Sequence, residues 1–459
     1  MDRHESKGVG IERKFSRRRF LQTTSAVIGA GSLAALAGCV APAAPTGPAV
    51  EAYELRFIKL AMSDVIADYF HDTVIPEFEA ANEGATVTVD MSTWGNLGEK
   101  LLTSFAGNIP VDLLETGSDW VGPYAKRDQF LSIESYVVNQ YQDEIVDFYP
   151  DMVELSRYGG DLRGLPYILD IRTLCYRKDH FEEAGLDPEV PPDTWDDLVD
   201  FGTRLLQMDD QGNFERAGYL LNAAGPGGAF FEYWYLLVQN GSGVVVPWGS
   251  WDPEDVAFNG PEGLEALQFM YDLIHTHAIT PMTGMSSQNP SLSPLGAGVA
   301  SMHNTGAWEI GNWKQNQADN IHLLGVGIPL MKVRRLQYAV PNVYAVGSNT
   351  RDADRAWALM EHMVSRETLT GMLGPVSQSP PRMSIAAEAE YMQDPLLKKY
   401  QAIPEEGWGT TTPQAVDFPT LELIGQYVQA ALRDEMGLQA ALDAAAAEVQ
   451  QKIIEALEA

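Results

Sequence analysis

Several kinds of residue and motif are scarce in this sequence of 459 residues, and each shortage excludes a class of protein. Lys and Arg number only 31 against 63 Asp and Glu, which leaves a formal net charge of −32. A nucleic-acid partner and direct adsorption to anionic lipid are disfavoured, because both need a basic face. Only two cysteines are present, Cys39 and Cys175. This number excludes a disulfide framework and a cysteine-rich metal site, and the simplest role for Cys175 is that of a lone buried thiol.

Catalytic and nucleotide-binding motifs are also missing. The sequence has no Gly-rich phosphate loop ending in Gly-Lys-Ser/Thr, no nucleophile elbow and no His-Glu-x-x-His. His275 and His277 lack a visible third ligand, so surface histidines are favoured over a zinc site. Carboxylates are so common that no pair stands out as acid and nucleophile. We therefore expect no catalytic residue, no metal and no cofactor.

Apolar residues, in contrast, are plentiful at 45%, with ten Trp, eighteen Tyr and sixteen Phe. This content excludes intrinsic disorder as a class. The length predicts two or three domains, or two lobes that share one chain.

The first 38 residues have the pattern of an export signal. A basic run at 17–19 follows Ser16 and precedes Phe20 and Leu21, and the stretch 21–50 carries no charge. Its apolar core, about 26–37, is too short to cross the ~30 Å hydrocarbon layer of a membrane. The paired arginines resemble the twin-arginine pattern, so residues 1–38 are predicted to be a cleaved signal peptide.

The sequence Leu36-Ala37-Gly38-Cys39 resembles the lipobox of bacterial lipoproteins. Cys39 is therefore predicted to accept a diacylglycerol and to become the first residue of the mature chain. Residues 39–50, rich in Ala and Pro, fit a semi-extended tether. This pattern predicts an exported protein that is lipid-anchored at the outer face of the cytoplasmic membrane.

The body of the chain has an α/β pattern. Apolar residues alternate at 53–57 and 87–91 as in strands, and recur at helical spacing between them. Such a βαβ unit predicts parallel pairing. Residues 111–114 predict another strand, Thr194 predicts a helix N-cap, and the tail from about 419 to 457 is predicted to be helical. The acidic segment 209–213 is most simply a turn, since it lacks the spacing of an EF-hand.

Tryptophan is the most informative residue type. Eight tryptophans lie in Gly/Ser/Thr/Asn-rich contexts: Trp94, Trp120, Trp234, Trp248, Trp251, Trp308, Trp313 and Trp408. A tryptophan in such a loop offers a flat apolar face to the C–H surface of a sugar ring, while charged neighbours take the hydroxyls. An ordinary packing role is an equally good interpretation for any one of them.

Four groups of short motifs follow one another in an order typical of one family. They are 94–102 with 108–114, then 164–172 with 176–186, then 298–302 with 306–308, and last 326–329 with 343–346 and 356–357. Together they resemble the family 1 extracellular solute-binding proteins of ABC importers, the maltose-binding-protein-like group. The resemblance extends over the whole chain after the tether.

This resemblance implies a two-lobed periplasmic-binding-protein fold of type II, in which crossing strands join the lobes and a ligand cleft lies between them. One lobe would comprise 51–168 and 330–373, and the other 172–326 and 378–459. Hinge strands are expected near 168–172, 326–330 and 374–378. The implied function is a monomeric, membrane-anchored receptor that captures a carbohydrate, in particular an oligosaccharide, and delivers it to an ABC permease.

The resemblance also implies a set of ligand-binding residues. Asp170 matches a cleft carboxylate that accepts sugar hydroxyls, Arg172 lies two residues further on the same strand face, and Trp308 matches a stacking aromatic. Segment and chemistry add a further set: Trp94, Asp119, Trp120, Tyr167, Trp234, Glu309, Tyr344, Arg382 and Trp408.

Three alternatives to this function remain open. The same receptor could take a polyol or a glycerol phosphate ester, for which clustered basic groups or a helix N-terminus would be needed. A secreted glycoside hydrolase would need two carboxylates at a fixed separation and turnover of the sugar. A signalling partner would bind sugar without delivering it.

Overall fold

The first two strands form a parallel pair at one end of the main sheet, and a helical segment connects them. The computed structural model describes residues 51–285, 288–412 and 415–458. The predicted signal peptide, Cys39 and the tether lie outside these residues. β1 (Tyr53–Leu60) pairs in parallel with β2 (Ala85–Ser92), with Tyr53 opposite Ala85. The predicted βαβ unit is therefore confirmed.

The helical connection of this unit contains one irregular turn. α1 (Asp64–Tyr69) continues through a π-helical segment, η1 (Phe70–Val74), into α2 (Ile75–Ala81). Pro76 lies in the first turn of α2 and has no N–H to donate to the preceding turn. A π turn accommodates this break in the hydrogen-bond ladder without ending the helix.

Within the described residues, eight strands form one mixed sheet. The main path runs β10–β6–β11–β3–β1–β2, with β9 beside β6 and β12 beside β11. The other six strands of the sheet are β3 (Leu113–Gly117), β6 (Gly164–Arg177), β9 (Met302–Gly306), β10 (Leu324–Val326), β11 (Gln337–Ala345) and β12 (Gly409–Thr410). Two short hairpins are separate from it: β4 (Arg157–Tyr158) with β5 (Asp161–Leu162), and β7 (Gln207–Met208) with β8 (Phe214–Arg216).

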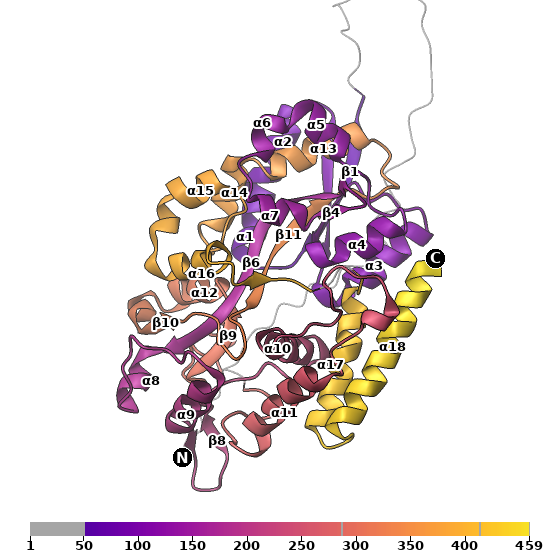
Figure 1. The fold of residues 1–459 in the computed structure, drawn as a ribbon. Helices are drawn as coiled ribbons and strands as arrows, with labels where there is room; N and C mark the ends of the chain where they lie inside the picture. Colours follow the sequence, from indigo (N-terminus) through magenta and orange to yellow (C-terminus); the bar gives the residue numbers. More distant parts are fainter. Residues whose placement is uncertain (1–50, 286–287, 413–414, 459) are drawn as a thin grey trace, which may run out of the picture. The chain divides into compact units, whose positions relative to one another are not determined.

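β6 is the strand that joins the two ends of this sheet. Its first part pairs with β11, up to Ile171 opposite Ala339. Its second part pairs with β9, from Arg172 opposite Gly306, and with β10. β6 and β11 lie side by side through the centre of the described chain (Figure 1). The point where β6 exchanges partners falls within the segment 168–172.

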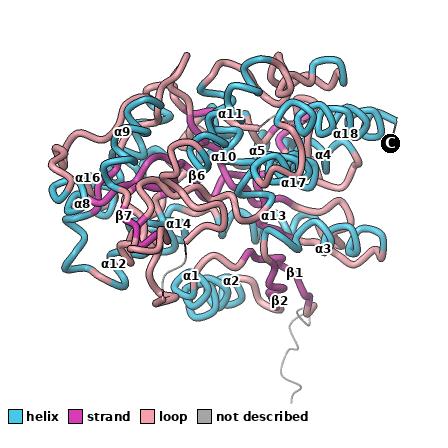
Figure 2. The backbone as a smooth tube through the Cα atoms, turned by 90° about the horizontal axis from the view of Figure 1, so that it is seen from below, coloured by secondary structure: helices cyan, strands magenta, loops and turns pink. Residues whose placement is uncertain are grey.

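Helices surround the strands. They are α3 (Trp94–Ala106), α4 (Ser118–Lys126), α5 (Glu134–Gln140), α6 (Gln142–Ile145), α7 (Pro150–Glu154), α8 (Lys178–Glu183), α9 (Trp195–Leu205), α10 (Pro226–Gln239), α11 (Pro261–His275), α12 (Trp308–Asn316), α13 (Ala353–Met363), α14 (Arg366–Leu373), α15 (Met383–Glu388), α16 (Pro395–Glu405), α17 (Phe418–Leu432) and α18 (Leu438–Glu458). Short 3-10 turns are η2 (Pro253–Asp255), η3 (Ala318–Leu323) and η4 (Glu390–Gln393). Seen from below, α1 and α2 lie beside β1 and β2, while α10, α11, α17 and α18 lie together (Figure 2).

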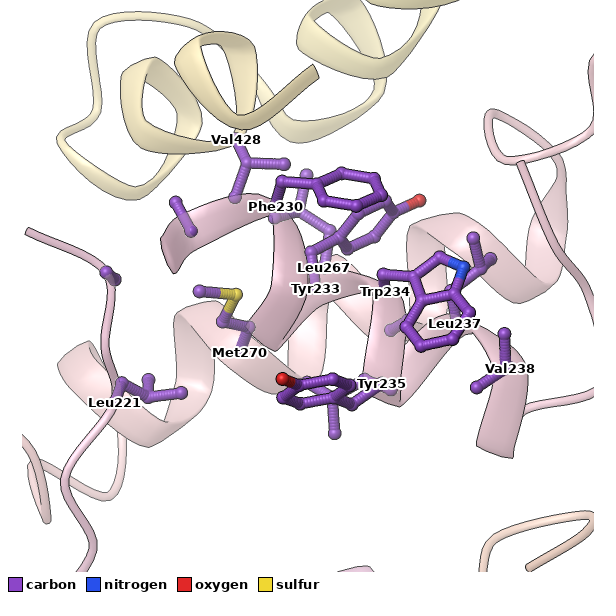
Figure 3. Close-up of a cluster of buried hydrophobic side chains, with 14 of the residues drawn as sticks. Leu221, Phe230, Tyr233, Trp234, Tyr235, Leu237, Val238, Leu267, Met270 and Val428 are labelled. Atoms are coloured by element: carbon purple, nitrogen blue, oxygen red, sulfur yellow. The ribbon is translucent and has the colours of Figure 1, made fainter. Parts of the chain in front are cut away.

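Two large groups of buried side chains form around different elements. The first, the β1 core, contains Phe57, Phe70, Leu113 and Trp357 and packs β1 and β3 against α1, α2, α13 and α14. The second, the α10 core, packs α10 between α11 and α17. Figure 3 shows Phe230 and Tyr233 of α10 beside Val428 of α17 and Leu267 of α11. The assignment of every segment to a lobe remains a prediction.

Local signals in the sequence are confirmed at several element ends. Thr194 caps α9: its hydroxyl accepts from the Asp197 amide, and the Asp197 carboxylate accepts from the Thr194 amide. The turn predicted at 209–213 joins β7 to β8, with Asp209 accepting from the Asn213 amide. The helical tail consists of two helices, because Asp434 takes a left-handed φ of 59° between them.

Cys175 and the histidines have ordinary surroundings. The Cys175 side chain is buried, and its sulfur lies 3.0 Å from the Tyr400 hydroxyl. His275 contacts the Leu432 carbonyl oxygen at 2.8 Å. Among the described residues no three His, Cys, Asp or Glu side chains are grouped so that they could hold a metal ion. In the same part of the chain no helix is long and apolar enough to cross a membrane.

Candidate ligand-binding cleft

A cleft of about 350 Å³ lies where β6 and β11 meet the ends of four helices. Residues from the two strands line it together with residues at or near the N-termini of α3, α4, α10 and α17. The lining residues are Trp94, Asp119, Trp120, Asp170, Arg172, Asn222, Gly227, Gly228, Phe231, Tyr338, Asn342 and Phe418. Five of the residues predicted from the sequence are therefore brought together: Trp94, Asp119, Trp120, Asp170 and Arg172.

A bidentate ion pair lies along β6 in this cleft. Arg172 Nε and Nη2 donate to the two oxygens of Asp170 at 3.0 and 2.9 Å, because residues two apart on a strand share a face. Arg172 Nη1 also donates to the Tyr235 hydroxyl at 3.1 Å. Burial opposes the guanidinium charge, but Asp170 outweighs it and holds the pKa of Arg172 above its ordinary value.

Aromatic rings surround this guanidinium. The centre of the Arg172 guanidinium lies 4.9 Å from the Phe231 ring, 5.2 Å from the Tyr338 ring and 5.4 Å from the Trp308 ring. Trp308 itself does not line the cleft, but this contact places it next to the ion pair, and 40% of its side chain is exposed. Gly306 makes this placement possible, since a Cβ there would lie 1.9 Å from the Trp308 ring.

Asp119 is a buried carboxylate with few partners. Only 5% of it is exposed, and no side chain of the described residues donates a hydrogen bond to it. Burial raises its pKa to about 7; its own backbone N–H opposes this shift, and the nearby charge of Asp170 adds to it. Asn342 of β11 is similarly placed, with 6% exposure and no side-chain hydrogen bond to the described chain. Both groups are therefore available to a ligand.

One wall of the cleft is a stack of aromatic rings. The Trp120 ring lies 6.0 Å from the Phe418 ring and 5.7 Å from the Tyr124 ring, with interplanar angles of 21° and 23°. Trp94, half-buried at the start of α3, adds a third large ring to the lining. These rings come from α3 and α4 and from α17, which is far from both in the sequence.

The opposite wall is the start of α10. Gly227 and Gly228 occupy its first turn, after Pro226, where backbone N–H groups have no partner inside the helix. A Cβ on Gly228 would lie 2.2 Å from the Asn222 carbonyl oxygen, so only glycine allows this close approach. The helix therefore presents bare backbone donors to the cleft.

The remaining predicted residues do not line this cleft, and each has other partners. Tyr167 and Tyr344 stack on each other in the β1 core, with ring centroids 4.3 Å apart. Trp234 is 1% exposed and belongs to the α10 core, where Figure 3 shows its indole beside Leu237. These three side chains pack against helices and sheet strands that are distant in the sequence, so local sequence context did not reveal their burial.

Three polar or partly exposed candidates also lie elsewhere. Glu309 is buried and accepts from Ser293 and, at 2.8 Å, from the Trp313 indole. Arg382 is buried and pairs with Glu144 at 2.8 Å and with Asp147 at 3.2 Å. Trp408 packs beside the Arg335 guanidinium, whose centre is 5.5 Å from its ring.

Sequence reasoning missed seven of the lining residues: Asn222, Gly227, Gly228, Phe231, Tyr338, Asn342 and Phe418. The Gly225-Pro226-Gly227-Gly228 sequence was a usable signal, because Pro at the first position of a helix predicts an N-terminus. Tyr338 and Asn342 have no comparable signal, since they face the cleft only through the pairing of β11 with β6.

The chain matches one protein-family model over most of its length. Residues 73–399 match the model described as bacterial extracellular solute-binding protein. A protein of Brucella abortus (strain 2308), named as a binding protein, is 22% identical over 322 residues, which are 69% of this chain and 73% of that protein. The arabinooligosaccharide-binding protein of Halalkalibacterium halodurans is 27% identical over 147 residues, 32% of this chain and 30% of that protein.

A shorter similarity involves a different named ligand. The sn-glycerol-3-phosphate-binding periplasmic protein of Escherichia coli (strain K12) is 48% identical over 46 residues, 10% of each chain.

Solved structures share the fold. A solute-binding protein of Thermotoga lettingae bound to tagatose superposes with a TM-score of 0.75 at 22% identity, covering 87% of this chain and 99% of that one. The maltose/maltodextrin-binding domain of Bdellovibrio bacteriovorus bound to maltotriose gives 0.72 at 18% identity, covering 87% and 100%. The predicted α/β fold of two-lobed periplasmic binding proteins is confirmed.

Proposed function

Because this chain belongs to the bacterial extracellular solute-binding protein family, we propose that it is a non-enzymatic receptor for a carbohydrate, in particular an oligosaccharide. The observation that carries the proposal is the lining of the cleft. Stacked aromatic rings face it from one side, and Asp119 and Asn342 offer side chains that no described residue engages.

Each part of the cleft suits one part of a sugar. The flat face of Trp94 matches the C–H surface of a pyranose or furanose ring, whereas Trp120, 1% exposed and stacked on Phe418 and Tyr124, is a buried part of the aromatic wall. The Asp119 carboxylate can accept hydroxyl protons in charge-assisted hydrogen bonds, and the Asn342 amide can both donate and accept. The names of the arabinooligosaccharide-binding relative and of the maltotriose-bound structure support this cargo.

Capture without hydrolysis is favoured by the state of Asp170. A glycosidase needs one carboxylate as nucleophile or base beside a second one as acid. The raised pKa of Asp119 would suit an acid. Both oxygens of Asp170, however, are engaged by Arg172, which leaves that carboxylate poorly disposed to attack or to activate water.

Export, anchoring and delivery complete the proposal. The twin-arginine-like signal, the lipobox at Cys39 and the tether at 39–50 support a monomeric receptor held at the outer face of the cytoplasmic membrane. From there it would hand the sugar to an ABC permease.

A second cargo, a polyol or a glycerol phosphate ester, is favoured by the start of α10. Free N–H groups at Gly227 and Gly228 and the Arg172 guanidinium border the same cleft, and a helix N-terminus attracts anions. The 46-residue similarity to a glycerol-3-phosphate-binding protein points the same way. The carboxyl groups of Asp119 and Asp170 in the same cleft disfavour a phosphate.

Titration calorimetry on the chain beginning at Ala41 tests the function. We expect binding of malto-, manno- or arabino-oligosaccharides without product formation on long incubation. Trp94→Ala should weaken this binding by roughly tenfold, because a stacking face is lost. Trp408→Ala, an equally half-buried tryptophan outside the cleft, is the matched control and should bind as the unaltered chain does. If only glycerol 3-phosphate or ribitol gives a heat of binding in the titration, the cargo is the second one. Cleavage of the sugar would contradict a receptor role.

A further inference from the structure

We propose that the ligand continues out of the cleft into a groove between α4 and the pair α17–α18, where Trp251 forms an outer subsite for additional sugar units. This inference rests on the carbohydrate-binding function proposed above. It specifies the cargo as a chain long enough to reach beyond the cleft.

The groove adjoins the cleft, because neighbouring compartments share lining residues. A middle compartment of about 340 Å³ shares the Trp94, Trp120 and Phe418 side chains with the cleft. The same compartment shares Arg127 and Asp417 with an outer compartment of about 540 Å³. The outer compartment alone is within the ~300–1,000 Å³ range of small-molecule sites. The three compartments therefore follow one another along the ends of α3, α4 and α17, with side chains common to each neighbouring pair.

Trp251 gives the outer compartment an aromatic face. The loop before η2 carries this residue to the far side of the groove, where it is partly buried against the α10 core. The Tyr158 ring meets it edge-on at 6.2 Å, and Lys126 Nζ lies 5.8 Å from its ring centre. These contacts hold the indole in place before a ligand arrives, which lowers the entropy lost on stacking.

The charges around the outer compartment are balanced, unlike those of the whole chain. Lys126, Arg127 and Lys452 face Asp417, Glu448 and Glu455. Arg127 and Asp417 approach to 3.8 Å, and Lys452 and Glu455 to 2.9 Å. A surface with donors and acceptors but no excess charge suits a neutral ligand rich in hydroxyl groups better than an ionic one. In a chain with a net charge of −32, such a balance is a local feature.

The groove also offers an uncommitted amide. Gln426 is exposed on α17, lines the outer compartment, and makes no side-chain hydrogen bond with the described chain. An amide beside an indole can bind the hydroxyls of a sugar that stacks on that indole.

Affinity as a function of chain length tests the subsite. Trp251→Ala and the unaltered chain are titrated with malto-, manno- and arabino-oligosaccharides of one to six units. We expect affinity to rise with length in the unaltered chain. Trp251→Ala should lower affinity for the longest bound member by about tenfold and change that for the shortest by less than twofold.

Two further variants keep the test independent of folding. Trp248→Ala removes a neighbouring tryptophan that lines a different cavity, so it should leave the length dependence unchanged. Gln426→Ala, at an exposed position, should flatten the length dependence even if Trp251→Ala proves unstable. Equal losses at all lengths, or none in either groove variant, would overturn the subsite while leaving the receptor function intact. If no sugar binds the unaltered chain, the receptor function itself is wrong.

Discussion

Two buried carboxylates near the cleft differ in what surrounds them. Burial raises the pKa of both Asp119 and Glu232 to about 7. Glu232 accepts hydrogen bonds from the Tyr219 hydroxyl at 2.9 Å and from the Asn222 amide at 3.4 Å. Asp119 has no such donor from the side chains of the described residues. Of the two, Asp119 is the group whose hydrogen-bonding capacity remains for a ligand.

Asp119→Asn should raise stability and lower affinity. The folded-state pKa of about 7 exceeds the ordinary value of 3.8, so the unfolded chain gives up this proton first as the pH rises. The native carboxylate therefore costs stability increasingly between about pH 4 and pH 7, and by roughly 4 kcal/mol above that range. Asn removes that cost, and urea unfolding should show a larger stabilisation at pH 8 than at pH 5.

The affinity of Asp119→Asn for sugar should fall, although its stability rises. The ionised carboxylate accepts hydroxyl protons more strongly than a neutral amide, so Asp119→Asn should weaken sugar binding about 10- to 100-fold at pH 8. In the unaltered chain the same affinity should decline from pH 8 to pH 5 as Asp119 takes up its proton. A pH-independent affinity would show that Asp119 does not touch the ligand.

At this scale the sequence identifies residues with a local motif and misses the others. Asp170 was predictable from the family resemblance of its segment, and Arg172 followed because a strand places alternate residues on one face. Trp234 lies in the α10 core because α10 is buried on several sides, and the aromatic and aliphatic residues around it in the sequence are consistent with that packing role. Phe418 and Tyr338 reach the cleft only through tertiary packing.

At the scale of elements, the start of α10 carries a tight packing constraint. Gly225 is its N-cap, and a Cβ there would have open space, whereas a Cβ on Gly228 would collide with the Asn222 backbone. Because the same turn forms one wall of the cleft, its packing and the binding geometry depend on each other.

Gly228→Ala should therefore disturb both folding and binding. We expect a loss of about 1–3 kcal/mol in the free energy of unfolding, typical of overpacking, together with weaker sugar binding. Gly225→Ala is the control three residues earlier and should change either quantity little. Calorimetric melting and titration of both variants provide the measurement. An equal effect of the two substitutions would mean that backbone freedom, and not the clash, governs this turn.

Several helices and strands were predictable from the sequence, whereas the irregular turns within the helical segments were not. The parallel pair β1–β2 and the Thr194 cap followed from alternation and capping residues. The π turn at 70–74 and the break at Asp434 depend on single residues whose effect is decided by neighbouring packing. Local sequence patterns carry little information on such details.

For the whole described chain, the central feature is that β6 and β11 each contribute to more than one group of buried side chains. Leu165 of β6 and Tyr344 of β11 belong to the β1 core, while Leu174 of β6 and Val340 of β11 belong to the α10 core. Neither core can lose its packing without disturbing a strand of the other.

Thermal unfolding of the chain from Ala41 should accordingly show one cooperative transition. We expect the calorimetric enthalpy to equal the van't Hoff enthalpy within error. A saturating sugar should shift the single midpoint upward by mass action. Two resolved transitions, or a ligand that moves only part of the heat absorption, would show that the cores unfold independently.

The position of β11 between β3 and β6 also has a consequence for synthesis. Both neighbours leave the ribosome well before residue 337, so each exposes an unpaired edge on the nascent chain until β11 arrives. At about 5–20 residues per second, that interval is on the order of 10–30 s. Open strand edges invite intermolecular pairing. A cell that makes this protein must therefore keep incomplete chains apart, and chaperone supply, rather than the stability of the finished molecule, would limit its yield.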